Sequence, residues 1–247
     1  MNIKHMIALL CLALCFCCLA GACTDTNTPI SNYDYSIDMK PYSKYINTTD
    51  KQYLVLLNKT HPSGEHYAPA DLVKLDNTMT LYGKEIELRK YPAMATEALI
   101  KELHARGYTD IVVTSGYRSY SYQQSLFNTY VEQEMTAHPD WTRQQAEQQV
   151  LTYSAAPGTS EHHTGDVIDL ISVNYVSLDE TFAQNPAYEW LVANAHHFGF
   201  ILRYPADKTH ITGYSYEPWH YRFVGVKAAT EIYEQGLTLE EYLGELD

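Results

Sequence analysis

The chain has 247 residues and contains 17 Lys and Arg against 30 Asp and Glu, which gives a formal net charge of −13. A strongly acidic protein repels phosphate backbones, so we expect no nucleic acid partner. The length behind a short leader suits one domain large enough to bury a core, and the sequence contains neither an internal repeat nor a second linker.

The first 22 residues predict an export signal of the lipoprotein type. Lys4 provides a basic start, residues 6–19 are almost wholly apolar, and small residues precede Cys23, as in a bacterial lipobox. The apolar run is shorter than the ~20 residues that span a bilayer, so an uncleaved anchor is disfavoured. Residues 20–22 also suit an ordinary signal peptidase cut, which would release the protein. We favour an exported cell-envelope protein, anchored by a lipid on Cys23 to the outer face of the cytoplasmic membrane.

Residues 23–50 predict a flexible tether, because they are rich in Thr, Asn, Ser and Asp and lack a sustained apolar period. Whether their tyrosines dock on the domain stays open. Residues 51–247 form the predicted domain, and all five cysteines of the chain precede it, the last being Cys23. The domain therefore has no disulfide and no thiolate ligand, so a metal site in it must consist of His and carboxylate side chains.

The sequence of the first part of the domain predicts a strand, a helix and a second strand. Residues 53–57 form a short apolar run that is typical of a strand. Pro92 lies in the first turn of a helix, and apolar residues recur at helical spacing until Gly107 ends it. Residues 110–114 are then a buried strand, which delivers Arg118 just beyond its end. An arginine there can point into a cleft, although most arginines in such places pair with acids or lie at the surface.

The rest of the domain alternates helices and strands. Helices are predicted from Ser121 to about residue 135 and from residue 140 to residue 153. A polar loop then leads into a buried strand that ends at Leu170. A helix after Asn185, a strand over residues 200–204 and a short amphipathic helix over residues 237–243 follow. This pattern indicates an α+β domain with a mainly antiparallel central sheet flanked by helices.

Two stretches carry imidazole and carboxylate groups beside apolar runs, where such groups need a partner. His162 and Asp169 lie at the two ends of one loop and strand, and Glu217 precedes His220 by three positions farther along. Two His and one Asp would leave a tetrahedral zinc ion one open position, and Glu217 would be the base that accepts a proton there. His163 is as good a ligand as His162 by spacing alone.

Glu217 and His220 can reach the same site only under one geometric condition. Residues three apart in a regular strand point to opposite faces of the sheet, so both reach one site only if Glu217 lies in a loop and the strand begins near Trp219. Pro218 supports that start, because proline belongs at the first residue or the edge of a strand. The metal is then expected in a cleft on one face of the sheet.

The spacing of these residues resembles the VanY-type D-alanyl-D-alanine carboxypeptidases, which are zinc peptidases of the bacterial cell wall. The resemblance rests on Ser160-x-His162-x-x-Gly165-x-x-x-Asp169, on Glu217-Pro218-Trp219-His220 and on Ser115-Gly116-Tyr117-Arg118-Ser119. It extends from about residue 53 to the C-terminus. It implies one zinc ion per chain, bound by His162, Asp169 and His220, with His162 and not His163 as the ligand.

The resemblance also implies catalytic roles for Glu217 and Arg118 and a substrate pocket lined by four further residues. These are Ser160, Gln123, Tyr204 and Trp219. A planar guanidinium suits either the terminal carboxylate of a substrate or the charge that develops on the scissile carbonyl. The implied reaction is removal of the terminal D-alanine from a peptidoglycan stem peptide, by a protein that we expect to be a monomer.

Other functions stay open at this level. The family includes L,D-carboxypeptidases and dipeptidases with the same site, and no motif determines the stereochemistry or length of the substrate. A non-catalytic wall-binding lipoprotein could retain the zinc fold, but such a binder has no need of a proton acceptor at Glu217. Non-haem iron oxygenases also use two His and one carboxylate, but the expected export and Glu217 fit zinc better.

Overall fold

The computed structural model describes residues 33–245 of the chain. The predicted export signal, Cys23 and the tether residues up to 32 lie outside the described residues. The described part combines helices with antiparallel strands, which confirms the predicted α+β class. Between residues 33 and 245, no helix has both the length and the hydrophobicity needed to cross a bilayer.

The central sheet has the strand order β3-β4-β6-β5, and every neighbouring pair is antiparallel. Its strands are β3 (Ile111–Ser115), β4 (Val167–Ser172), β5 (Phe200–Leu202) and β6 (His220–Phe223). A separate small sheet pairs β1 (Leu72–Lys74) with β2 (Glu87–Arg89). The central strands lie where the apolar runs predicted them, and β6 begins directly after Trp219, which confirms the start that Pro218 indicated.

The alternation of side chains gives the central sheet two different faces. Ile168 and Leu170 of β4 belong to the main hydrophobic core, together with Tyr221 of β6. Asp169 lies between the two core residues of its strand and therefore points to the opposite face. It pairs in register with His220. The two polar residues thus lie side by side on the face that the main core does not cover.

Helices cover the core face of the sheet. α2 (Lys90–Ala105) buries small residues such as Ala95 and Ala98 against it, which allows close packing. α5 (Pro186–Asn194) runs on into a 3-10 turn. α7 (Val226–Gln235) packs against that turn and against β5, where Ala229 and Ile232 form a second hydrophobic cluster with Ile201, apart from the main core. α2 and α5 agree with the sequence prediction, whereas α7 was not predicted.

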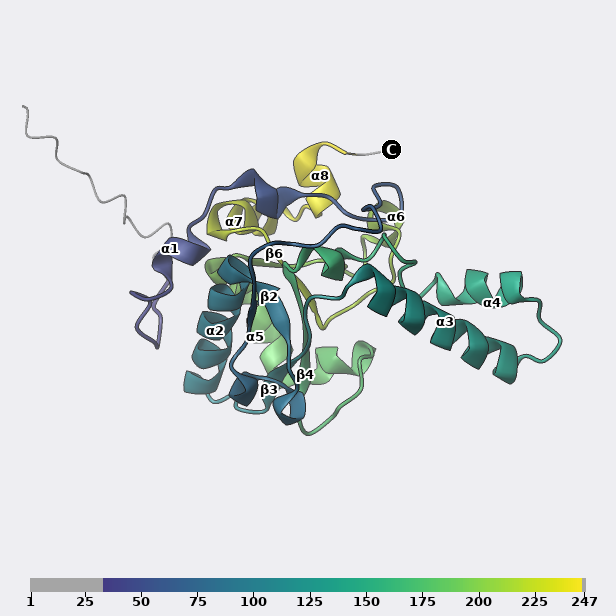
Figure 1. The fold of residues 1–247 in the computed structure, drawn as a ribbon. Helices are drawn as coiled ribbons and strands as arrows, with labels where there is room; N and C mark the ends of the chain where they lie inside the picture. Colours follow the sequence, from purple (N-terminus) through teal and green to yellow (C-terminus); the bar gives the residue numbers. More distant parts are fainter. Residues whose placement is uncertain (1–32, 246–247) are drawn as a thin grey trace, which may run out of the picture.

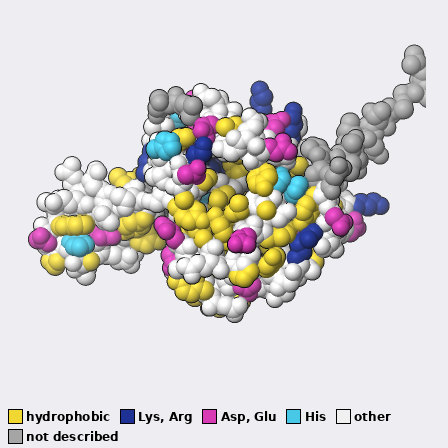
Figure 2. All heavy atoms as spheres, turned by 180° about the vertical axis from the view of Figure 1, so that it is seen from behind, with side chains coloured by type: hydrophobic (Ala, Val, Ile, Leu, Met, Phe, Trp, Pro, Cys, Tyr) yellow, Lys and Arg dark blue, Asp and Glu magenta, His cyan; other side chains and the backbone are white. Residues whose placement is uncertain are grey.

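α3 (Tyr120–Ala137) and α4 (Arg143–Val150) form a hairpin that projects from the body of the molecule in both views (Figure 1 and Figure 2). α4 starts with a capping box formed by Thr142 and Gln145. The two helices share a small core of their own around Val131, and both were predicted. Short helices lie at α1 (Ser43–Ile46), α6 (Thr209–Thr212) and α8 (Leu239–Leu243), of which the last was predicted.

The predicted strand over residues 53–57 is wrong. The structure has a 3-10 helix at Lys51–Leu54, and the ring of Tyr53 is buried against Tyr91 and Phe223. The backbone carbonyls of Tyr53 and Val55 accept hydrogen bonds from Arg222. The guanidinium of Arg222 thus takes the place of a neighbouring strand as hydrogen-bond donor to these two carbonyls. The apolar run at residues 53–57 gives no sign of this distant partner.

The predicted tether needs correction for residues 33–50. Tyr42 and Ile46 are buried in the main core, with exposures of 5% and 3%. The backbone amide of Ser36 donates to the buried carboxylate of Glu102 on α2. The segment is polar in composition, but its few apolar side chains find a surface already formed by α2. The domain therefore includes residues 33–50.

Candidate active site

A cleft of about 460 Å³ opens on the sheet face opposite the main core. Asp169 and His220 line it from neighbouring strands, and α3 contributes a wall through Tyr122, Leu126 and Tyr130. Figure 2 shows hydrophobic side chains gathered where the hairpin meets the body. The position of the cleft on one face of the sheet is the one that the sequence predicted.

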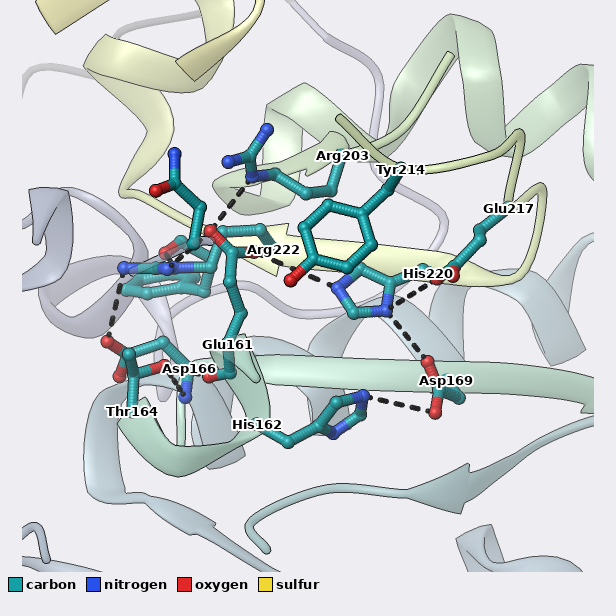
Figure 3. Close-up of polar contacts among 12 residues, drawn as sticks. Glu161, His162, Thr164, Asp166, Asp169, Arg203, Tyr214, Glu217, His220 and Arg222 are labelled. Atoms are coloured by element: carbon teal, nitrogen blue, oxygen red, sulfur yellow. Dashed lines mark hydrogen bonds and ion pairs between the residues drawn. The ribbon is translucent and has the colours of Figure 1, made fainter. Parts of the chain in front are cut away.

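The structure brings His162, Asp169 and His220 together in this cleft. All three are buried, and they offer ligand atoms that lie within 4.8 Å of one another. Nε2 of His162 is 3.2 Å from Oδ2 of Asp169, and Nδ1 of His220 is 3.1 Å from Oδ1 of the same carboxylate. Figure 3 shows the carboxylate contacting both rings. Residues from a loop and from two strands thus converge on one point.

The chemistry of this cluster fits a metal ion. Nε2 of His162 and Oδ1 of Asp169 are buried and make no hydrogen bond to any described residue. Burial lowers the pKa of His162 to about 4, and the nearby charge of Arg118 acts in the same direction. The ring is therefore neutral near pH 7 and keeps a lone pair. Buried polar atoms without partners are costly, and a bound cation would satisfy both of them.

Local backbone geometry holds His162 in this orientation. The residue lies on a 3-10 turn that ends at Gly165 with a φ of 71°, a conformation that other residues rarely adopt. Nδ1 of His162 donates to the carbonyl of Gly116 at 2.6 Å. A Cβ atom on Gly116 would lie 2.7 Å from the backbone oxygen of Glu87, so only glycine fits there. The hydrogen bond leaves Nε2 as the lone-pair nitrogen, directed at Asp169.

Glu217 lies in the loop before β6, and its carboxylate extends over the cluster. Its Oε2 is 3.3 Å from Nδ1 of His220, and the amide of His220 donates to the carbonyl of Glu217 in a tight turn. Burial raises the pKa of Glu217 to about 7, while the charge of His220 acts against this rise. A carboxylate with this pKa can accept and return a proton near neutral pH.

Arg118 reaches the cluster from the loop between β3 and α3. Its amide donates to the carbonyl of His162, and its guanidinium is 3.9 Å from Oδ2 of Asp169. Nη1 donates to Oε1 of Gln123, whose own amide donates to the carbonyl of Ala155. Gln123 is fully buried. Gln123 does not line the cleft and supports Arg118 from behind, so the substrate contact that the resemblance implied for it stays a prediction.

The other predicted pocket residues do line the cleft. Ser160, Tyr204 and Trp219 contribute to its walls, and the ring of Tyr204 lies 4.8 Å from that of His220, centroid to centroid. Tyr214, which the sequence did not single out, packs against Tyr204 and lines the same wall. The cleft is thus aromatic beside the polar cluster.

His163 faces away from the cluster. Its Nδ1 donates to the carbonyl of Arg118, and its Nε2 accepts a hydrogen bond from the amide of Gly158. Both ring nitrogens are therefore in use, and the ring is neutral. Burial lowers the pKa of His163, which favours the same form. His163 thus connects the loop that carries Arg118 to the turn at Gly158, which precedes the 3-10 turn of His162.

We expect His163→Ala to keep its metal and to lose stability. The change removes two hydrogen bonds and a buried ring, which together should cost about 2–4 kcal/mol. Activity should also fall, because the loop that carries Arg118 loses an anchor. Metal content and thermal melting of the purified variant measure the two effects. A folded variant without metal would show that His163 is a ligand after all.

Comparison with known proteins places this geometry in a family. The family model VanY, D-alanyl-D-alanine carboxypeptidase, matches residues 85–226, a span that contains the whole cluster. The chain belongs to the VanY family. The resemblance that the sequence motifs suggested is thereby confirmed.

Two curated relatives align with most of the chain. A D-alanyl-D-alanine carboxypeptidase of Enterococcus faecalis is 42% identical over 190 residues, which cover 77% of this chain and 65% of that protein. The putative carboxypeptidase YodJ of Bacillus subtilis is 38% identical over 192 residues, which cover 76% of this chain and 66% of that protein. The chain thus spans slightly less than two thirds of the length of these relatives.

Solved structures of two kinds share the VanY-type fold. The vancomycin resistance D,D-pentapeptidase VanY, crystallised as a mutant in complex with Zn(II), has a TM-score of 0.65 and 38% identity, and the match covers 78% of this chain and 99% of that chain. The LdcB LD-carboxypeptidase has a TM-score of 0.69 and 35% identity, with coverages of 81% and 90%. The fold of this chain is therefore similar to that of both kinds of carboxypeptidase.

Behind the VanY-type cluster lies a buried ion network that the sequence analysis missed. Glu161 is almost fully buried, and its Oε1 accepts hydrogen bonds from Arg203 at 2.9 Å and from Arg222 at 3.2 Å (Figure 3). Arg203 also binds both carboxylate oxygens of Glu240. One signal was present in the sequence, because Arg222 stands two residues after His220 in a strand and so shares its face.

Proposed function

We propose that the chain is a zinc-dependent carboxypeptidase that removes the terminal D-alanine from peptidoglycan stem peptides. The observation that carries this proposal is the cluster of His162, Asp169 and His220 with the carboxylate of Glu217 beside it. Three ligands and a proton acceptor are the parts of a metal hydrolase, and a protein that only binds the wall has no use for the acceptor. Relatives that match most of the domain are named for this activity, and one was solved with Zn(II).

Each residue of the site has a task in this reaction. Zinc held by His162, Asp169 and His220 would polarise the scissile carbonyl and lower the pKa of a water molecule. Glu217 accepts the proton of the attacking water and passes it to the amine that leaves. Arg118 stabilises negative charge, either on the terminal carboxylate or on the carbonyl oxygen. The reaction is hydrolysis of a peptide bond beside a free carboxylate.

Mass spectrometry of defined stem peptides tests the proposal. The zinc-loaded protein is incubated with a pentapeptide that ends in D-alanyl-D-alanine and with the tetrapeptide that lacks the last residue. We expect the pentapeptide to lose one alanine. Loss from the tetrapeptide alone would indicate an L,D-carboxypeptidase, which the similarity to LdcB supports as the second candidate. No cleavage of either peptide would overturn the proposal.

Amidation of the substrate's C-terminal carboxylate is expected to slow turnover about 10- to 100-fold. The side chain of Arg118 is 20% exposed in the cleft, and a hydrogen bond to a charged group contributes about 1.5–3 kcal/mol. Rates on the free and the amidated pentapeptide, followed by mass spectrometry, give the ratio. Equal rates would point to an endopeptidase.

We also propose that the protein acts outside the cytoplasm, held to the membrane by a lipid on Cys23. The support is the basic start, the apolar run and the small residues before Cys23, together with a substrate class that lies in the wall. Cys23→Ala should move the protein from the membrane fraction to the soluble fraction, because the attachment point is lost. Immunoblots of fractionated cells measure this. A variant that stays membrane-bound with its leader uncleaved would indicate a transmembrane anchor.

A further inference from the structure

Glu161 lies on the side of His220 that faces away from Asp169, and its two oxygens have different surroundings (Figure 3). Oε1 accepts the hydrogen bonds of Arg203 and Arg222. Oε2 is buried, makes no hydrogen bond to a described residue and faces Nε2 of His220 at 3.8 Å. That nitrogen is also buried and lacks a hydrogen bond within the described domain. A carboxylate oxygen and a ring nitrogen thus face each other across a short gap.

The gap is small enough to close. An ordinary N–H···O hydrogen bond is about 2.9 Å long, so a movement of roughly 1 Å suffices. The carboxylate of Glu161 is held in this direction, because both arginines bind its other oxygen and all three side chains have 0% exposure. Water at the surface therefore offers Oε2 no alternative partner.

The orientation of His220 decides which of its nitrogens is available to a metal. Nδ1 faces the cluster, 3.1 Å from Asp169 and 3.3 Å from Glu217, whereas Nε2 faces Glu161. A histidine that binds a metal is neutral and carries one ring proton, so a hydrogen bond from Nε2 leaves the lone pair on Nδ1. The ring is a metal ligand from the cluster side only in this tautomer.

We propose that Glu161 is a positioning residue for the metal site. Its carboxylate accepts the Nε2 proton of His220 and so keeps Nδ1 as the ligand atom, while Arg203 and Arg222 hold that carboxylate in place. This role deepens the zinc site proposed above and rests on it. It also explains why an ion network stands behind a catalytic cleft, since carboxylates that orient a histidine ligand strengthen metal binding.

Glu161→Gln tests this role. The arginines should keep hold of the amide oxygen, so that the amide nitrogen turns to His220 and donates where the carboxylate accepted. The opposite tautomer, with its proton on Nδ1, is then favoured and the ligand atom is blocked. We expect zinc affinity to fall about 10- to 100-fold, measured by competition with a chromophoric chelator.

Glu240→Gln is the matched control. Glu240 binds the same Arg203, at 2.6 and 2.9 Å, and is also buried, with 2% exposure. The change removes the same charge from the same network at a residue that hydrogen-bonds Arg203 and Asn58 and not His220. Both variants should melt at lower temperature, but only Glu161→Gln should bind zinc more weakly. Equal zinc affinity in Glu161→Gln and wild type would overturn the proposal and assign Glu161 a structural role.

Nitrogen-15 NMR of the zinc-loaded wild type gives a second readout that does not depend on how a variant folds. We expect His220 to carry a proton on Nε2 and none on Nδ1. A proton on Nδ1, with normal zinc binding, overturns the role of Glu161 and leaves the proposed function standing. A wild-type protein that binds no zinc overturns both. The two failures are thus distinguishable.

Discussion

Glu217→Gln is expected to lower the rate of peptide hydrolysis by about 10²–10⁴-fold while the protein keeps its fold and its metal. Gln has nearly the shape of Glu but cannot accept a proton from the attacking water. None of the ligands His162, Asp169 and His220 changes. Burial raises the pKa of Glu217 to about 7, which means that the charged form is costly there, so a neutral side chain should leave the melting temperature unchanged or slightly higher.

The measurements are zinc per chain, thermal melting and kcat for the pentapeptide, compared with Glu65→Gln. Glu65 is exposed in a loop and does not line the cleft, so its substitution makes the same chemical change without consequence for the site. We expect wild-type kcat for Glu65→Gln. A Glu217→Gln protein with full zinc and near-normal kcat would remove Glu217 as the base.

His220→Ala is expected to lose both activity and the stabilisation that zinc provides. The change removes one of the three ligands, and zinc that binds only the folded state stabilises it by RT ln(1 + [Zn]/Kd), which is about 2.7 kcal/mol at a hundredfold excess over Kd. The relevant quantity is the difference in melting temperature with and without zinc. The absolute melting temperature also reports the cavity left by the ring, which is 4% exposed in the wild type.

The control is His210→Ala, which removes an exposed imidazole from α6. It should keep the zinc-induced shift in melting temperature and the wild-type rate. If His220→Ala shows the same zinc-induced shift as wild type, His220 is not a ligand and the cluster of buried side chains needs another explanation.

Much of the site could be predicted because it obeys local rules. Alternation along a strand places Asp169 opposite its apolar neighbours Ile168 and Leu170, and Pro218 separates the loop position of Glu217 from the strand position of His220. These rules act within a few residues, so a sequence displays them directly. The placement of Asp169 and His220 on one sheet face followed from them.

Other features depend on partners far along the chain. The segment at residues 53–57 is not a strand, because its backbone carbonyls accept hydrogen bonds from the side chain of Arg222. Residues 33–50 pack on the domain because α2 offers them an apolar surface. Gln123 lies behind the cleft for the same kind of reason, since its side chain hydrogen-bonds Arg118 and the carbonyl of Ala155. Neither composition nor hydrophobic periodicity predicts contacts between residues that are this far apart in the sequence.

The sequence by itself determined the α+β class and predicted the kinds of ligand and the base, because hydrophobic periodicity, proline placement and the chemistry of His and carboxylate groups are properties of short stretches. Only the tertiary structure decided, from contacts and not from resemblance, that His162 faces Asp169 and His220 and that His163 does not. Both rings lie in one short loop, and their directions are set by the carbonyls of Gly116 and Arg118, which the fold brings there from more than 40 positions away. The same is true of Glu161. Its carboxylate contacts Arg203, Arg222 and His220, and the energy of a buried charge depends on the groups that surround it.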